Sequence, residues 1–170
     1  MQRPKGMAFI FLLLIILMSC GYRLTGRGEK FNDIQTLAIS LFSNKTSERE
    51  LEREMTGAIR EELLTDGRVK LVSQGDADAI LLGTIESYLL KPLIFDSADR
   101  VLQYRLEITA SIKVEDRLRQ KVFLNQSLKI SQEYSLSGRV ASDESARKEA
   151  LKIVSRKLAQ EITSLLIEGF

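Results

Sequence analysis

The clearest pattern in the chain is an alternation of apolar and polar positions in its second half. Residues 102–114 place an apolar side chain at every second position, and residues 122–134 largely repeat this pattern. A period of two is typical of a strand with one buried face and one face open to water. A polar turn over residues 116–121 separates the two segments. The sequence therefore predicts a long antiparallel hairpin with one polar face.

Two other segments place their apolar residues at the spacing of a helix face. The first follows a capping-box signature at residues 47–50 and continues to about Thr65, where Gly67 suits a left-handed C-terminal position. The second is expected to run from residue 142 or 143 to about residue 167. The apolar stripes are Leu51, Met55, Ala58, Ile59 and Leu63 in the first helix, and Leu151, Val154, Leu158, Ile162 and Leu165 in the second.

Shorter apolar segments at residues 36–42, 68–73 and 79–90 predict three more strands, with a turn at residues 43–46. The expected order is β-α-β-β-β-β-α. Two amphipathic helices must then cover one face of the sheet, because the other face is polar along at least two strands. The predicted fold class is α/β (α+β), a two-layer sandwich in which two helices pack on one face of a mixed four- to five-stranded sheet.

An apolar segment interrupted by Pro92 follows the third of these strands. We predict a loop over residues 91–96, since proline removes a hydrogen-bond donor from a strand. Its apolar side chains, Leu93, Ile94 and Phe95, allow two interpretations. They cap the core, or they form an exposed surface for a partner or for acyl chains. We favour the first interpretation.

The first nineteen residues have the features of an export signal. Arg3 and Lys5 precede an uncharged segment at residues 7–18, which is too short to span a bilayer but has the length of a signal-peptide core. Ser19 and Cys20 then resemble the cleavage site of a bacterial lipoprotein. We expect residues 1–19 to be removed as a lipoprotein signal peptide.

Cys20 is then the N-terminal residue of the mature protein and its predicted lipidation site. Its thiol would carry a diacylglycerol and its new amino group an acyl chain such as palmitate, and two or more chains hold a protein firmly to a membrane. We expect a lipidated tether at residues 20–30 and a single α/β domain at residues 31–170. Because Gly21 follows the cysteine, where an aspartate would mark retention at the inner membrane, the expected location is the periplasmic side of the outer membrane.

Composition excludes most catalytic chemistry. The chain has no histidine and its only cysteine is the predicted anchor, so histidine bases, histidine metal ligands and a second cysteine nucleophile are excluded. Asp76 and Asp78 flank a turn and are interpreted as turn residues, not as catalytic or metal-binding carboxylates. We predict a protein that is not an enzyme and that has no cofactor and no metal site. Without the signal segment, 23 basic residues balance 23 acidic ones, which argues against nucleic acid as a partner.

Positive charge is concentrated in the predicted hairpin. Three of its basic residues should project from the polar face of the sheet, and three more crowd the turn that joins the two strands. One hypothesis is a surface for an anionic ligand that carries phosphates or carboxylates. The other interpretation is a solvated edge whose charges discourage aggregation. The candidate ligand residues are Arg105, Lys113 and Lys129 on the face, and Arg117, Arg119 and Lys121 at the turn.

The order and spacing of several short motifs resemble the LptE family of lipopolysaccharide-assembly lipoproteins. The motifs are the segment Cys20 to Leu24, the spacing Ile39-x-x-Phe42-x-Asn44-x-Thr46, the segment Ala77 to Gly83, the Tyr104-Arg105-Leu106 strand and the pair Leu158-Ala159 in the last helix. The resemblance implies a protein that sits in the lumen of the outer-membrane barrel LptD in a one-to-one complex. There it would help to assemble the barrel and to insert lipopolysaccharide into the outer leaflet.

Residues 37–83 also look like the α/β unit of two other classes of periplasmic lipoprotein. These are the curli-secretion-channel type and the penicillin-binding-protein activators, which would make the protein a pore subunit or an enzyme activator. The absence of an obvious membrane hairpin and the short segment after the last helix disfavour both classes.

Overall fold

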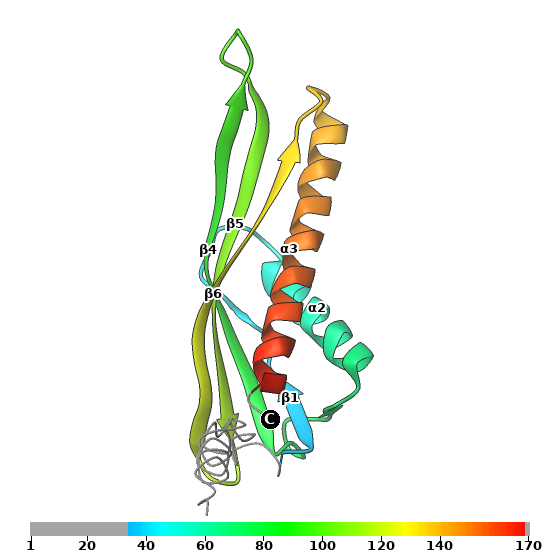
Figure 1. The fold of residues 1–170 in the computed structure, drawn as a ribbon, viewed down its shortest axis with the longest axis vertical. Coiled ribbons are helices and arrows are strands. Elements are labelled where there is room, and N and C mark those ends of the chain that lie inside the picture. Colours follow the sequence, from blue (N-terminus) through cyan, green and yellow to red (C-terminus); the bar gives the residue numbers. More distant parts are fainter. Residues whose placement is uncertain (1–33, 169–170) are drawn as a thin grey trace, which may run out of the picture.

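The computed structural model describes residues 34–168, so the predicted signal segment, Cys20 and the tether lie outside the described residues. The molecule is elongated, with the long strands and the last helix running along its length (Figure 1). Its elements are the strands β1 (Thr36–Ile39), β2 (Ser43–Asn44), β3 (Lys70–Leu71), β4 (Ala79–Phe95), β5 (Val101–Asp116) and β6 (Lys121–Ser135), and the helices α2 (Leu51–Asp66) and α3 (Val140–Glu168).

The strands form one mixed sheet in the order β3-β1-β4-β5-β6, with β2 paired beside β4. β1 is parallel to β3 and β4, whereas β4, β5 and β6 are antiparallel. The predicted hairpin is therefore confirmed, and its pairing extends from Gln103 opposite Ser135 to Asp116 opposite Lys121. The predicted fold class is also confirmed, and the short strand β2, which was not predicted, brings the sheet to six strands.

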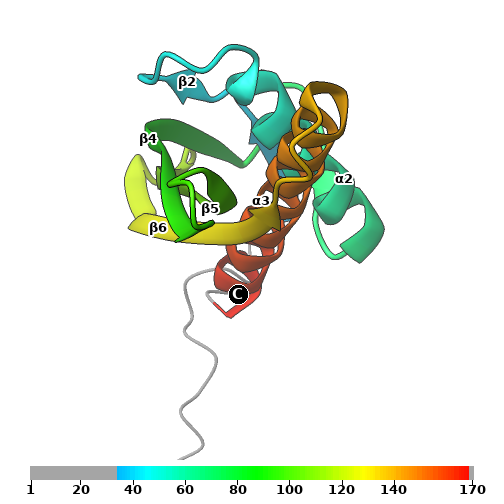
Figure 2. The same cartoon turned by 90° about the horizontal axis from the view of Figure 1, so that it is seen from above.

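Both helices lie on one face of the sheet, and the main core fills the space between the layers (Figure 2). Along β5 every second residue from Leu106 to Val114 is buried on this face. Burial of each large apolar side chain stabilises the fold by about 1.5–3 kcal/mol relative to exposure. The helices contribute Leu51, Met55, Ile59 and Leu63 from α2, and Val154, Leu158, Ile162 and Leu166 from α3.

The loop between β1 and β2 packs an aromatic ring onto the sheet. We predicted a strand through Phe42, but β1 ends at Ile39, and Ser43–Asn44, predicted as a turn, forms β2. The N–H of Phe42 donates to the Thr56 hydroxyl at 3.0 Å, which ties the loop to α2. The Phe42 ring occupies the space where a β-carbon of Gly83 would lie, so glycine is required there by close approach.

The predicted capping box does not form at the start of α2. Glu50 has φ 65° and no side-chain oxygen caps the first turn. Asn44 instead holds the approach to the helix, because its amide donates to the Glu48 carbonyl at 2.8 Å and to the Glu52 carboxylate at 3.0 Å. At the other end the prediction is confirmed, since Gly67 has φ 70° and its N–H donates to the Leu63 carbonyl.

Pro92 does not break its strand, so the predicted loop at residues 91–96 is wrong. β4 continues to Phe95, and Pro92 lies opposite Tyr104. The Leu136 N–H donates to the Leu102 carbonyl at 2.8 Å, so Leu102 bonds to β6. In the same register Tyr104, two residues further along β5, also bonds to β6, and its backbone groups point away from β4. The missing N–H of Pro92 therefore faces the open edge of the sheet, where no ladder bond is lost.

Within residues 34–168, no helix has both the length and the apolar character that crossing a membrane requires. The long helix α3 begins at Val140, slightly before the predicted start, and charged residues cover its outer side. Both described helices belong to the layer that covers the sheet.

Candidate functional site

The polar face of the long strands carries three of the six predicted ligand residues. Arg105, Lys113 and Lys129 project from it, as expected, but each lies against a carboxylate. The Arg105 guanidinium is 2.7 Å from the Glu133 carboxylate on β6, and the Lys113 ammonium is 2.6 Å from the Glu115 carboxylate. The positive charge on this face is thus largely compensated by carboxylates of the same sheet.

Glu107 is the centre of the tightest charged group on this face. Its carboxylate accepts hydrogen bonds from Lys91 on β4, at 3.0 Å, and lies 2.8 Å from the Lys129 ammonium on β6. The side chain is only 9% exposed, although both lysines are at least half exposed. Hydrogen bonds from Lys129 and Lys91 lower the pKa of Glu107, so the carboxylate stays charged. Lys91 was not among the predicted ligand residues, because its strand was expected to end at residue 90.

The other three predicted ligand residues lie at the opposite end of the hairpin from the β4–β5 turn (Figure 1). The Arg117 guanidinium donates to the carbonyls of Gln74 and Gly75, the latter at 3.0 Å, and so ties the β5–β6 turn to the turn before β4. Arg119 lies 3.9 Å from the buried carboxylate of Asp116. Lys121 pairs with Asp116 in the ladder. The structure therefore separates the six candidates into a face group and a turn group.

Asp76 and Asp78 act as turn and strand-entry residues, in agreement with the interpretation from sequence. Asp76 accepts a hydrogen bond from the Ser73 hydroxyl at 2.6 Å. Asp78 accepts from the Thr36 hydroxyl at 2.7 Å and from the Thr36 and Gln35 N–H groups. These bonds, the Thr36 hydroxyl first, lower the pKa of Asp78. The Asp78 carboxylate fastens β1 to the start of β4, and the Asp76 carboxylate closes the turn before it.

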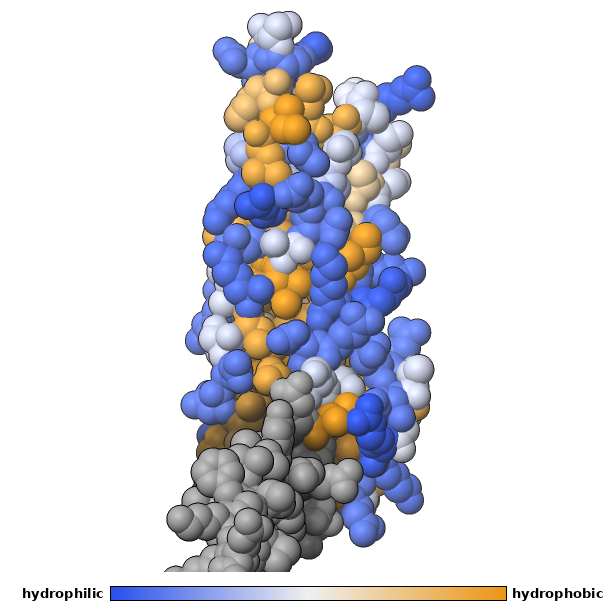
Figure 3. Space-filling model, viewed as in Figure 1, coloured by the Kyte–Doolittle hydropathy of each residue, from blue (hydrophilic) through white to orange (hydrophobic). Residues whose placement is uncertain are grey.

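An apolar belt surrounds the end of the β4–β5 hairpin. We define the tip as residues 89–105, none of which is buried. The sequence-based preference for Leu93, Ile94 and Phe95 as a cap on the core is wrong, because Ile94 and Phe95 are about half exposed and Leu93 is only partly covered. In Figure 3, apolar surface lies just below a polar end at this end of the molecule. The exposed members are Leu89, Leu90, Ile94, Phe95 and Leu102, with Val140 at the nearby start of α3.

A short polar turn closes the hairpin beyond this belt. Asp96 accepts hydrogen bonds from the backbone N–H groups of Arg100 and Ala98, and its carboxylate lies 2.8 Å from the Arg100 guanidinium. The two backbone hydrogen bonds lower the pKa of Asp96, the Arg100 bond most. The turn is thus held in one shape. The belt extends from Leu89 and Leu90, where β6 still borders the hairpin, to Ile94 and Phe95 at its two-stranded end. Exposed apolar side chains gathered in this way form a candidate interaction surface.

A group of polar side chains fastens the start of α3 beside the tip. The Arg147 guanidinium donates to Glu48 at 2.9 Å, to Glu144 at 3.1 Å and to the Tyr88 hydroxyl at 3.1 Å. The Glu144 and Glu48 bonds raise the pKa of Arg147, and burial raises the pKa of Tyr88. Arg147 therefore joins α3, β4 and the loop before α2 just below the apolar belt.

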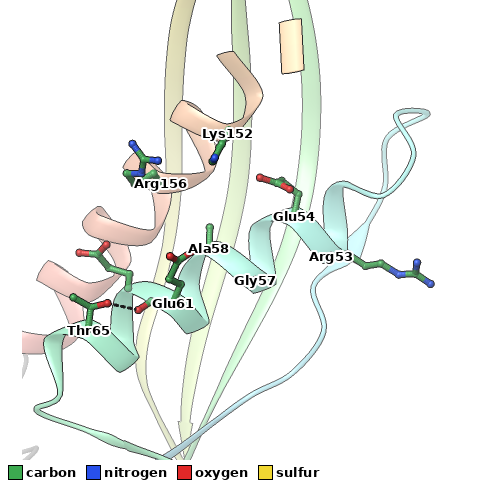
Figure 4. Close-up of a pocket in the computed structure, with 9 residues that line it drawn as sticks. Arg53, Glu54, Gly57, Ala58, Glu61, Thr65, Lys152 and Arg156 are labelled. Atoms are coloured by element: carbon green, nitrogen blue, oxygen red, sulfur yellow. Dashed lines mark hydrogen bonds between the residues drawn. The ribbon is translucent and has the colours of Figure 1, made fainter. Parts of the chain in front are cut away.

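A shallow hollow of about 460 Å³ lies between α2 and α3 on the side away from the sheet (Figure 4). Glu54 and Glu61 line it from α2, and Lys152 and Arg156 line it from α3, with Gly57 and Ala58 at its floor. Within the part of the chain that the structure describes, no three His, Cys, Asp or Glu side chains are placed to hold a metal ion. The hollow has the character of a solvated groove between two charged helix faces.

Solved structures with the same fold come from several bacteria. Rare lipoprotein B from Shewanella oneidensis matches with a TM-score of 0.56 and 19% identity, over 78% of this chain and 93% of that chain. A hypothetical protein from Chlamydia trachomatis matches with a TM-score of 0.56 and 15% identity, over 79% and 96%. A minor lipoprotein from Acinetobacter baumannii matches with a TM-score of 0.51 and 17% identity, over 76% and 90%. At these identities the likeness shows the fold alone.

Sequence comparison adds the family. No curated protein is similar enough to this chain to match it. The family model described as LptE, lipopolysaccharide-assembly, matches residues 34–166, which include every strand and nearly all of both helices described above. The resemblance inferred from the short motifs is therefore confirmed, and the chain belongs to the LptE family of lipopolysaccharide-assembly lipoproteins.

Proposed function

We propose that this protein is an outer-membrane lipoprotein that forms a one-to-one complex with an LptD-like barrel and helps to insert lipopolysaccharide into the outer leaflet. The observation that carries the proposal is the family match over residues 34–166. The role is that of a plug and assembly factor, with no catalytic step. In this proposal residues 1–19 are removed, residues 20–30 carry the lipid and tether, and residues 31–170 act as one domain on the periplasmic side.

Two features of the surface support a barrel as partner. The lumen of a membrane barrel is polar, and the open face of the long strands presents compensated charges and hydroxyl groups that suit such a wall. The tip adds an exposed apolar belt, and contact of this belt with a partner would be more favourable than contact with water. In this proposal the polar face lies against the wall of the barrel lumen, and the tip makes the contact that lies deepest in the barrel.

Affinity purification tests this assignment. We expect a tagged full-length chain, extracted in detergent from outer membranes, to retain one large barrel protein in equal amount together with lipopolysaccharide. Replacing Ile94 and Phe95 together by aspartate should remove the barrel without changing the fold, since both side chains are about half exposed. Exposed Leu64 on α2 is the matched control, and Leu64→Asp should retain the barrel. Recovery of the chain without any barrel would overturn the proposal.

Lipidation of Cys20 has its own test. We expect Cys20→Ala to abolish acylation of the protein, because the diacylglycerol can no longer be attached. Mass spectrometry of the N-terminal peptide should find the acylated cysteine only in the unchanged protein. An unmodified Cys20 in membrane-bound protein would contradict the anchor.

The six basic residues remain our proposed contacts for the anionic glycolipid. We expect Arg117→Glu, Arg119→Glu and Lys121→Glu together to weaken retention of lipopolysaccharide in a pull-down, and the corresponding reversal of Arg105, Lys113 and Lys129 to do so independently. Lys148→Glu on α3, whose side chain is 73% exposed, controls for a general change of charge. Unchanged retention in either triple variant would remove that group from the ligand surface, provided that circular dichroism shows a folded protein.

A further inference from the structure

The outer edge of β6 has a regular row of backbone groups that point away from the sheet. The Leu136 N–H donates to the Leu102 carbonyl at 2.8 Å, and the register between β5 and β6 is unbroken from residue 135 to residue 124. In an antiparallel ladder only alternate residues bond to the neighbouring strand. Even-numbered residues of β6 therefore bond to β5. The outward groups belong to Asn125, Ser127, Lys129, Ser131, Glu133 and Ser135.

The opposite edge of the long strands carries a proline and several bulges, which are lacking along most of this edge. β4 carries Pro92 at an outward position and has register shifts at three places. β6 has no proline, and its one irregularity lies beyond residue 124, near the turn. Proline and bulges are the usual devices that stop an edge from pairing. Within residues 34–168, no strand pairs with the outer edge of β6.

A groove of about 510 Å³ runs between this edge and the second half of α3. Lys129, Ile130 and Ser131 form one wall, and Lys157 and Glu161 belong to the other. The groove follows the edge just where the outward groups lie. An extended chain placed in it would have backbone partners on β6 and side-chain contacts on α3.

Two side chains now cover part of this edge. The Lys157 ammonium donates to the Gln132 side-chain carbonyl at 2.9 Å and to the Ser131 backbone carbonyl at 3.5 Å. The Gln132 amide donates to the Glu133 carbonyl at 2.9 Å. Among the described residues, Lys157 donates to an amide and a backbone carbonyl and forms no ion pair, although Glu161 lines the same groove.

We propose that the outer edge of β6 receives an extended segment of the barrel partner as an added strand, with an acidic side chain beside Lys157. The inference rests on the proposed function, because it takes the barrel as the partner. Three observations support this occupant. The edge borders the polar face that we propose for the lumen wall, a groove of about 510 Å³ lies along it, and Lys157 offers charge complementarity to an acid. A second copy fits poorly, since a two-fold axis at Ser131 would bring both Lys157 ammonium groups together.

Residue-resolved hydrogen exchange tests the proposal without any substitution. In the isolated full-length chain in detergent, the N–H groups of Ser127, Lys129 and Ser131 should exchange quickly, while those of Leu128 and Ile130 are already slow. In the purified complex with the barrel, the three outward groups should slow by at least about tenfold, because a new ladder protects them. Loss of this alternation on complex formation is the expected signature of strand addition.

Each other outcome overturns the inference. If the barrel is present but the three outward groups exchange as before, strand addition is wrong and the proposed function stands. If no barrel is recovered, both fall. If the three groups already exchange slowly in the isolated chain, the occupant of the edge is not the barrel. Faster exchange after removal of residues 20–33 would identify the chain's own N-terminal segment as the occupant, and faster exchange on dilution would identify a second copy.

A proline at the edge provides an independent variant. Ser127→Pro removes an outward N–H that the fold does not use, so the domain should fold, while the bond to an added strand is lost. We expect at least about tenfold weaker retention of the barrel, equivalent to about 1.4 kcal/mol. Ser127→Thr keeps the N–H and should retain the barrel fully. Equal retention by both variants would contradict the proposal.

Discussion

The base and the tip of the long hairpin have the same alternating sequence pattern but opposite surroundings. At the base, β5 places Ile108, Ile112 and Val114 at 1% exposure or less beneath the helices. At the tip, the same periodicity places Leu102 at 43% exposure, and no residue from 89 to 105 is buried. The base therefore provides most of the free energy of folding, whereas the tip provides surface.

The base and the tip differ in burial because different elements pack against them, and not because the strands themselves differ. β1 and β2 pair only with the part of β4 up to Ile85, and α3 reaches further but begins with an exposed residue, Val140. Beyond the start of α3 and the last pairing with β6, at Gln103, the hairpin is a two-stranded ribbon without a second layer (Figure 1). A ribbon of this kind has marginal stability by itself, so it depends on the packed base below it and on the Arg147 contacts beside it.

The largest effect on stability should come from truncating a buried side chain in the base. Ile112→Ala removes a fully buried side chain and should lower the free energy of unfolding by about 2–5 kcal/mol. Ile94→Ala, the same change at a tip position that is 49% exposed, should lie within about 0.5 kcal/mol of the unchanged protein. Urea titration of both variants measures the contrast. Equal losses would mean that the tip is packed as tightly as the base.

The close approach of Phe42 to the sheet should give the next largest effect. Gly83→Ala places a methyl group where the Phe42 ring lies, and the shift of a buried ring should cost about 1–3 kcal/mol. Gly57→Ala, on the outer side of α2, meets no atom within 4 Å and should stabilise by about 0.5–1 kcal/mol through helix propensity. Thermal unfolding of the two variants should therefore shift in opposite directions.

The Asp78 carboxylate should contribute a smaller, pH-dependent part of the stability of the base. Its pKa is lowered below its ordinary value of 3.8, chiefly by the Thr36 hydroxyl, so its contribution is present above that value and is lost as pH falls through the lowered pKa. Asp78→Asn should cost about 1–2 kcal/mol at pH 7. The gap between the two proteins should close below about pH 4. A gap of constant size down to pH 2 would contradict this assignment.

The sequence predicted the elements of the base well, because periodicity and helix-end signals depend on local chemistry. The alternation at residues 102–114 and Gly67 at the end of α2 are examples. It failed where a tertiary position decided the outcome. Pro92 was expected to end a strand, but its place at the open edge makes the missing donor harmless. The capping box predicted at residues 47–50 does not form, and hydrogen bonds from Asn44 hold the approach to α2 in its place.

The candidate site was less predictable for the same reason. Alternation identifies which residues share a face, and Arg105, Lys113 and Lys129 do share one. It gives no information on the carboxylates that neighbouring strands bring against them, such as Glu107 between Lys91 and Lys129. Nor does it indicate how far a covering helix extends, so Ile94 and Phe95 could not be distinguished from core residues by their sequence context.

The contrast between base and tip can be tested most directly by site-specific photo-crosslinking in living cells. A photoreactive residue in place of Leu102, at the tip, should join the protein to the outer-membrane barrel. The same residue in place of Leu64, on α2 and 63% exposed, should not. Barrel adducts at Leu102 alone would support the tip as the part that reaches the partner. Adducts at Leu64 with none at Leu102 would contradict the account.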